Sequence, residues 1–138
     1  MASAPDVHRQ ALTPYLIVKG ASRAIDFYMR AFGAEELFRL DGPDGRVGHA
    51  EIRIRDSVLM LADEHPDFGA LSPLSVGGSP VNLHLYVDDV DGTVERAVSA
   101  GAVVLRAVKN EAYGDRTGMI VDPYGHRWHV ATAIETTR

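Results

Sequence analysis

Apolar positions along the chain recur with helical spacing in two places, and short apolar runs of strand length lie on both sides of each. The first set falls at positions i, i+3, i+4 and i+7, which is one face of a helix. It consists of Ile25, Tyr28, Met29 and Phe32. A narrower stripe occurs in the second half, at Val94, Ala97 and Val98. The pattern predicts two helices, each flanked by strands.

Capping and turn residues give these helices their ends. Ser22 and Asp91 are candidate N-caps, because their side-chain oxygens can accept hydrogen bonds from the first helical turn. Gly33 and Gly101 are expected to end the two helices, since glycine adopts the left-handed conformation at little cost. Residues 122–125 read as a type I turn, with proline second and glycine fourth.

The order of elements in the first half of the chain repeats in the second half, at an offset of about 69 residues. Residues 15–18 correspond to residues 84–87 as the opening strand, and residues 58–61 correspond to residues 127–130 as the closing strand. Each half reads as a strand, a helix and three further strands. The sequence therefore predicts an α+β fold of two tandem βαβββ modules.

These modules divide the chain into parts. We expect a flexible tail at residues 1–10 and a single domain at residues 11–138. Within the domain, module one covers about residues 11–64 and module two about residues 81–135. The segment 65–80, rich in Pro, Gly and Ser, is either a linker or a lid. Helices on the outer face of the sheets would leave a half-barrel sheet with a concave cleft.

Composition narrows the classes of function. The net charge of −5 argues against nucleic acid as the main partner, because phosphate binding needs a concentrated positive face. Cysteine is absent, which excludes disulfides and thiolate chemistry. No apolar run reaches the roughly 18 residues of a membrane span, and the N-terminus lacks the apolar core of a signal peptide. We therefore expect a cytoplasmic protein that binds neither nucleic acid nor a membrane.

Seven stretches in a fixed order carry a resemblance to a known family. They are LTPYL at 12–16, AIDFY at 24–28, AFGA at 31–34, HAE at 49–51, DSVLMLADE at 56–64, GDRTG at 114–118 and DPYGHRW at 122–128. Together they resemble the vicinal oxygen chelate (glyoxalase/bleomycin resistance/dioxygenase) superfamily, and more closely its PhnB-like branch. The resemblance implies the fold above and a homodimer in which modules of two chains complete each other's clefts. It does not fix an activity, because this fold hosts isomerases, lyases, dioxygenases and antibiotic-binding proteins.

The resemblance also implies four metal-ligand positions, on the first and last strand of each module. In this sequence they are Thr13, Met60, Asn82 and His129. Only His129 is a good ligand for a divalent ion, whereas sites of this kind need about three. We therefore predict that the metal site of the family is absent and that no cofactor is required. The alternative is a divalent metal held by a different cluster, namely His49, Glu51, His84 and His129.

Strand alternation indicates which side chains line the cleft. Asn82, His84 and Tyr86 alternate with apolar residues, so this strand has one polar and one apolar face. His129 alternates with Trp128 in the same way, and His129 and His84 are the candidate acid/base groups. The predicted ligand-binding residues are Asn82, His84, Tyr86, Met60, His129, His49, Glu51 and Tyr113. Hydrogen-bonded polar wall groups without a ligand are the plainer interpretation of the same set.

Three functions remain open on the sequence. The first is a metal-independent small-molecule binder that holds an aromatic or antibiotic-like compound. The second is a lyase, isomerase or dioxygenase-like enzyme that uses His129 or His84 as acid or base, or the rebuilt metal cluster. The third is an interaction module with a filled cleft.

Overall fold

A computed structural model describes residues 10–135 of the 138-residue chain. The first module contains β1 (Tyr15–Val18), α1 (Ala21–Phe32), β2 (Glu35–Asp41), β3 (Val47–Ile54) and β4 (Ser57–Asp63). The second contains β5 (Asn82–Tyr86), α3 (Val90–Ser99), β6 (Val103–Asn110), β7 (Asp115–Val121) and β8 (Arg127–Ala133). The predicted tail at residues 1–10 lies outside the described residues, apart from Gln10.

Strand pairing confirms the two βαβββ modules. The strand order is β1-β4-β3-β2 in one four-stranded sheet and β5-β8-β7-β6 in the other. In both, the first strand runs parallel to the last, and the remaining pairs are antiparallel. Tyr15 lies opposite Met60, and His84 lies opposite His129, so the registers obey the offset of 69 read from the sequence. The expected half-barrel thus takes the form of two separate sheets.

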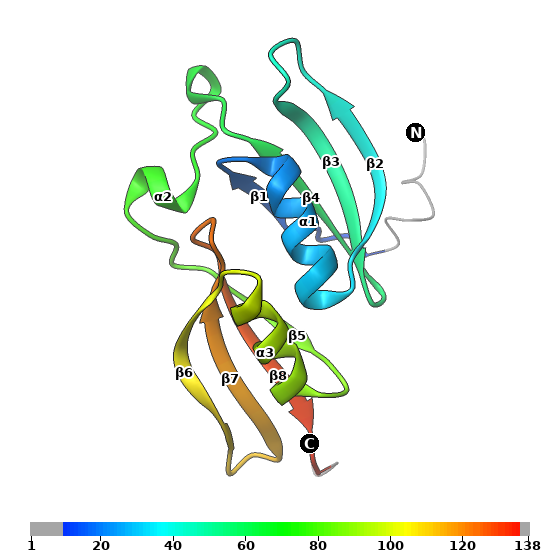
Figure 1. Ribbon diagram of the computed structural model, residues 1–138, viewed down its shortest axis with the longest axis vertical. Helices are drawn as coiled ribbons and strands as arrows, with labels where there is room; N and C mark the ends of the chain where they lie inside the picture. The colour runs from blue at the N-terminus through cyan, green and yellow to red at the C-terminus, as the bar shows by residue number, and fades with distance from the viewer. Residues whose placement is uncertain (1–9, 136–138) are drawn as a thin grey trace.

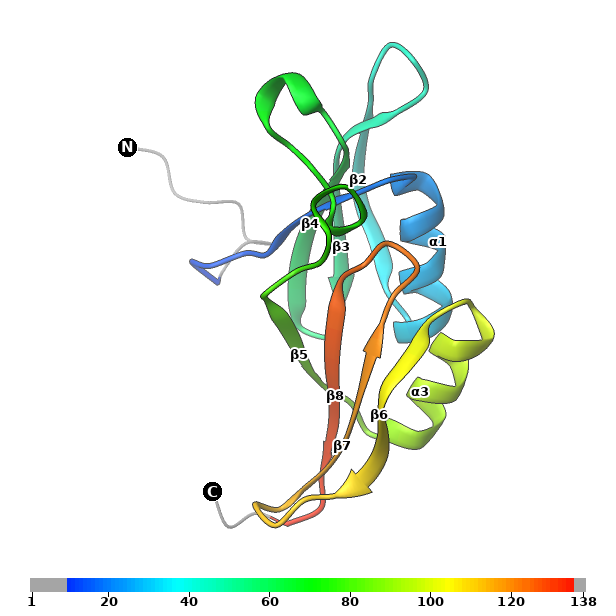
Figure 2. The same cartoon turned by 90° about the vertical axis from the view of Figure 1, so that its left-hand side faces the viewer.

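Helices α1 and α3 lie on the same side of the two sheets, and a short helix, α2 (Pro73–Val76), lies in the segment between the modules (Figures 1 and 2). One apolar core runs beneath α1 and α3, with Ile25, Tyr28 and Ile52 from module one and Trp128 and Val130 from module two. The modules meet through this helical layer, where α1 contacts α3 and the rings of Phe32 and Trp128 lie 4.6 Å apart. The opposite face of each sheet, which we call its open face, is not covered by α1 or α3 (Figure 2). No described helix has the length and apolarity needed to cross a membrane.

A buried carboxylate links the modules. Asp122, which is 3% exposed, accepts a hydrogen bond of 2.6 Å from the Tyr28 hydroxyl and one of 2.9 Å from Trp128 Nε1. Its other oxygen accepts from the backbone N–H groups of Tyr124 and His126, at 2.9 and 3.0 Å. Burial and the neighbouring Asp122 raise the pKa of Tyr28 well above its ordinary value, so the hydroxyl stays protonated and donates. The carboxylate therefore satisfies donors from both modules at once.

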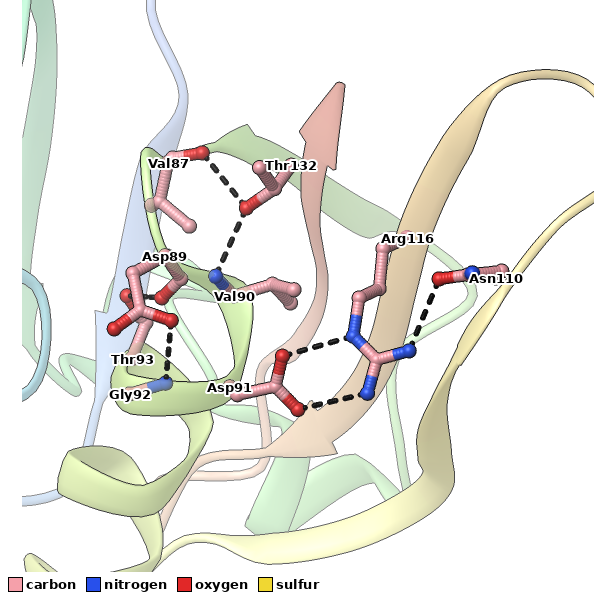
Figure 3. Close-up of polar contacts among 9 residues, drawn as sticks. All are labelled: Val87, Asp89, Val90, Asp91, Gly92, Thr93, Asn110, Arg116 and Thr132. Atoms are coloured by element: carbon pink, nitrogen blue, oxygen red, sulfur yellow. Dashed lines mark hydrogen bonds and ion pairs between the residues drawn. The ribbon is translucent and has the colours of Figure 1, made fainter. Parts of the chain in front are cut away.

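The ends of the helices are capped differently from the prediction. Gly20, not Ser22, occupies the N-cap of α1, and Asp63 accepts hydrogen bonds of 2.8 Å from Gly20 N and Ala21 N. A residue 42 positions away thus replaces the local cap. For α3 the cap is Asp89, which accepts from the N–H of Gly92 at 3.1 Å (Figure 3).

Asp91, which the sequence predicts as the N-cap of α3, instead forms an ion pair. Its two carboxylate oxygens accept from Arg116 at 2.8 and 3.0 Å, and Arg116 also donates to Asn110 (Figure 3). Hydrogen bonds from Arg116 lower the pKa of Asp91. The pair ties the start of α3 to β7 and β6. The predicted end of α1 is confirmed, since Gly33 is its C-cap and takes the left-handed conformation. Helix α3 instead ends at Ser99 with Ala100 as its C-cap, and Gly101, whose φ is positive, comes one residue later.

Candidate functional site

The open face of module two carries polar and aromatic side chains. Asn82, His84 and Tyr86 are exposed along β5, whereas Leu83 and Leu85 pack against the core on the other side. This is the alternation that the sequence predicts for the strand.

Two imidazoles and a phenol meet at the centre of this face. The ring of His84 lies 4.8 Å from that of His129 and 4.7 Å from that of Tyr86. The Tyr86 hydroxyl donates to the buried carboxylate of Asp115 at 2.7 Å. Tyr113 lies in the turn between β6 and β7, two residues before Asp115, and is half exposed. His84, His129 and Tyr86 therefore form one cluster of rings on this face.

The open face of module one has a hydrogen-bonded chain of three side chains. Tyr15 Oη lies 2.7 Å from His49 Nδ1, and His49 Nε2 lies 2.9 Å from a carboxylate oxygen of Glu51. A carboxylate only accepts, so His49 donates through Nε2; in the neutral ring, which has one N–H, Nδ1 then accepts from the Tyr15 hydroxyl. Partial burial and the Glu51 charge raise the pKa of Tyr15. The phenol is therefore protonated near neutral pH.

The sequence analysis missed Tyr15, although a signal for it existed. Tyr15 lies exactly one repeat, 69 residues, before His84. In the sheets the two occupy equivalent places, since Tyr15 lies opposite Met60 and His84 lies opposite His129. Met60 also lies opposite Glu51, which puts Tyr15, Met60 and Glu51 in one row across the open face.

The structure brings the residues of the alternative metal cluster together only in pairs. His49 and Glu51 are bonded on β3 of one sheet, and His84 and His129 are neighbours on β5 and β8 of the other. Among residues 10–135, no three His, Cys, Asp or Glu side chains converge to hold an ion. The four-residue cluster is thus not assembled within the described part of one chain.

A hollow of about 610 Å³ lies in module one, beside the open face. We call it the hairpin pocket, because the turn between β2 and β3 (residues 42–46) forms one wall. Tyr15 and Ile17 of β1 and Ala62 of β4 form its floor, and Phe68 and Ala70 of the inter-module segment form the opposite wall. Part of the inter-module segment therefore contributes side chains to the lining of this hollow.

Internal hydrogen bonds hold the walls of the hairpin pocket in place. Asp63 accepts from the N–H of Val47 at 2.8 Å in addition to its bonds at the start of α1. Glu64 accepts from Ser72 N at 2.7 Å and from the Ser75 hydroxyl at 2.5 Å, and these bonds lower its pKa to about 2. Both carboxylates are thus engaged by the chain itself.

Sequence comparison identifies relatives of the chain. A profile of the Glyoxalase/Bleomycin resistance protein/Dioxygenase superfamily matches residues 9–130. The uncharacterized protein Rv0887c of Mycobacterium tuberculosis (strain ATCC 25618 / H37Rv) is 45% identical over 127 residues, which cover 90% of this chain and 75% of that protein. The uncharacterized protein At5g48480 of Arabidopsis thaliana is 30% identical over 112 residues, which cover 76% of this chain and 67% of that protein.

Solved structures have the same fold. The X-ray structure of the Arabidopsis thaliana At5g48480 product superposes with a TM-score of 0.71 at 28% identity, covering 88% of this chain and 98% of the other. The PhnB protein from Bacillus cereus superposes with a TM-score of 0.68 at 20% identity, covering 90% of this chain and all of the other. At 20% identity, the match to the PhnB protein shows the fold alone.

Proposed function

The chain belongs to the glyoxalase/bleomycin resistance protein/dioxygenase superfamily, and on that premise we propose that it is a small-molecule-binding protein with a degenerate metal site. Its ligand is an aromatic or antibiotic-like compound held against the open faces of the sheets.

The chemistry of the four chelating positions carries this proposal. Thr13 and Met60 offer a hydroxyl and a thioether in module one, whereas Asn82 and His129 offer an amide and an imidazole in the sheet of module two. His129 lies opposite His84, and Asn82 lies opposite Arg127, a cation. A thioether, an amide and one imidazole do not fit a hard or borderline divalent ion. We therefore assign no step of the function to a metal.

The open faces favour a ligand that is flat and partly polar. Phe38 is 48% exposed, and its ring lies 6.1 Å from that of His49. Met60 adds a polarizable apolar group in the same sheet, and such groups make favourable contacts with aromatic rings. On module two, His84 and Tyr86 supply hydrogen-bonding groups beside their rings. This mixture of apolar surface and a few polar groups is typical of small-molecule sites.

A second copy of the chain is part of the proposal. The helices of the two modules pack on each other within one chain, which leaves both open faces uncovered by a further sheet. Exposed apolar side chains such as Leu40, at 59%, lie on the open face of module one. A second copy of the chain would cover this apolar surface, and its exposure therefore supports the homodimer that the family resemblance implies. Light scattering should then give about twice the 15.0 kDa chain mass.

A thermal-shift screen tests the binding function. The protein is heated with planar aromatic and peptide-like compounds, before and after treatment with a metal chelator. A compound at 100 times its dissociation constant stabilises the folded state by about 2.7 kcal/mol, enough for a clear rise in melting temperature. We expect at least one compound to raise it equally with and without chelator. The proposal fails if none does, or if every shift disappears with chelator and returns with a divalent ion.

Two single-residue variants test whether the ligand that raises the melting temperature is bound at module two. His84→Ala should reduce the shift, because it removes the imidazole beside His129 and Tyr86. Val98→Ala is a matched control, since Val98 is 43% exposed on α3, in the helical layer. Equal shifts in both variants would place the ligand away from His84.

The His84–His129 pair also favours a second candidate function. An imidazole exchanges a proton near neutral pH, and here two rings face the same surface, 4.8 Å apart. The protein would then be a lyase, isomerase or dioxygenase-like enzyme with His129 or His84 as acid or base. For any compound of the screen that is converted, turnover should be lost in His129→Ala. Unchanged turnover would exclude the role of His129.

A further inference from the structure

We propose that the hairpin pocket of module one binds an uncharged aromatic compound that carries an O–H or N–H group at the edge of its ring, and that Tyr15 accepts the hydrogen bond from that group. The inference rests on the proposed function and adds to it a position and a ligand chemistry. None of the eight ligand-binding residues predicted from the sequence lines this pocket, although Phe68 belongs to the segment that is a candidate lid.

The walls of the pocket select for a flat ring. The ring of Phe68 stacks on that of His65, with centroids 4.3 Å apart and planes inclined by 29°. Phe68 is 82% exposed although it is aromatic, so a large part of its ring is available to a ligand. Ile17 and Ala62 on the floor add apolar surface. A volume of about 610 Å³ is within the range of sites for drug-sized molecules, roughly 300–1,000 Å³.

The charges around the pocket select against anions. Three carboxylates line it, those of Asp44, Asp63 and Glu64, against one guanidinium, that of Arg46. The guanidinium is already paired with Asp44 at 2.6 Å. Asp63 and Glu64 accept their hydrogen bonds from the chain. An anionic ligand would meet a net negative rim, and these carboxylates already have donors, so a neutral ligand fits best.

The hydrogen bonding of Tyr15 determines that the ligand donates and Tyr15 accepts. Its single hydroxyl hydrogen is directed to Nδ1 of the neutral His49 ring, because the one N–H of that ring, at Nε2, donates to Glu51. The phenol is half exposed and lines the pocket, so its oxygen can accept a further hydrogen bond. A ligand hydroxyl or amine satisfies this oxygen, whereas an ether or a tertiary amine does not.

A matched pair of probes tests the proposal: 2-naphthol, which has the hydroxyl hydrogen, and 2-methoxynaphthalene, which lacks it. We expect calorimetric titration of the wild-type protein to show about 3- to 10-fold tighter binding of 2-naphthol, the size of one neutral hydrogen bond. In Tyr15→Phe this preference should fall to about 1, because the ring is kept and the oxygen is lost.

Two variants locate the binding site. Phe68→Ala should weaken both probes by a similar factor of about 3 or more, because it removes the stacking wall without touching the hydrogen bond. Met29→Ala is the control, since Met29 is also an exposed apolar residue of module one but lies on α1, outside the pocket lining. It should leave the affinity of both probes unchanged. Circular dichroism checks that each variant is folded.

The outcomes separate this inference from the proposed function. Stabilisation by other compounds of the thermal-shift screen without binding of 2-naphthol would overturn the inference and leave the proposed function standing. Binding of 2-naphthol that is insensitive to Tyr15→Phe and Phe68→Ala would place the ligand elsewhere and also overturn it. Failure of every compound would remove both. A preference that vanishes in Tyr15→Phe and an affinity that falls in Phe68→Ala would support the assignment.

Discussion

Replacing Tyr28 with phenylalanine removes one hydroxyl from the contact between the modules and should measurably destabilise the protein. Tyr28 is fully buried, and its hydroxyl donates to Asp122 at 2.6 Å, across 94 residues of chain. The aromatic ring remains in Tyr28→Phe, so its packing against Phe32 and Trp128 is kept. The variant thus isolates one charge-assisted hydrogen bond.

The expected magnitude follows from the partners that remain. A hydrogen bond to a charged group contributes about 1.5–3 kcal/mol. Asp122 keeps three other donors in Tyr28→Phe, so the carboxylate is not left unpaired, and we expect a loss near the lower end, about 2 kcal/mol. With an unfolding entropy of about 2.1 cal/mol/K per residue, 138 residues give about 0.29 kcal/mol/K. The melting temperature should therefore fall by about 7 °C.

Asp122→Ala should cost more, about 3–5 kcal/mol. It leaves the Tyr28 hydroxyl and the Trp128 indole N–H buried without their acceptor, and each such group costs about 1–3 kcal/mol. In the double variant, the Tyr28→Phe step should cost less than it does in the wild type, because the acceptor is already gone. That difference is the coupling energy of the two side chains.

Urea unfolding followed by the fluorescence of Trp128 measures these changes, since it is the only tryptophan and is 2% exposed. Tyr124→Phe is the matched control, because Tyr124 contacts Asp122 through its backbone N–H, and its hydroxyl can be lost with a change of about 0.5 kcal/mol or less. A loss below about 0.5 kcal/mol in Tyr28→Phe, or strictly additive costs in the double variant, would refute the view that Asp122 fastens the modules.

Three further predictions concern single positions. Hydrogen bonds hold the pKa of Glu64 at about 2, so its contribution to stability should be complete above pH 4.5 and be lost as the pH falls toward 2. In Glu64→Gln, acid unfolding should lack this part of the pH dependence. The same loss of stability between pH 4.5 and 2 in the variant and the wild type would contradict this role of Glu64. Asp89→Ala should lower the free energy of unfolding by about 1 kcal/mol in urea, because the α3 cap is lost, and no change would mean that another group caps the helix. Gly125→Ala should melt well below Gly45→Ala, although both residues have positive φ, because only at Gly125 would a Cβ come within 2.7 Å of Pro73. Equal melting temperatures would show that Pro73 moves aside.

Much of the architecture is determined by the sequence. The stripe of Ile25, Tyr28, Met29 and Phe32 predicts α1, and three of these four are buried in the structure, with Met29 half exposed. The offset of 69 predicts the two modules and is the same offset that relates the strand registers. The sequence reveals such features because helix periods, strand periods and glycine helix stops involve residues only a few positions apart.

The candidate site is only partly determined in this way. Alternation predicts the polar face of β5 and the pairing of His49 with Glu51, two residues apart on one strand. It does not predict Tyr15, whose contact with His49 spans 34 residues and depends on the pairing of β1 with β4 and of β4 with β3. The hairpin pocket is hidden for the same reason, since its walls come from β1, β4, a turn and the inter-module segment.

Tertiary structure alone decided the remaining features. Asp63 caps α1 from 42 residues away, and His126 Nε2 lies 2.9 Å from the backbone oxygen of Ile17, across 109 residues. It also decided that His49 and Glu51 lie on one sheet while His84 and His129 lie on the other. The Asp63 cap depends on how β4 and α1 come together within module one, whereas the contact of His126 with Ile17 depends on how the two modules dock. Both arrangements are selected by complementary shape and by the satisfaction of buried polar groups, which no local period of the sequence records.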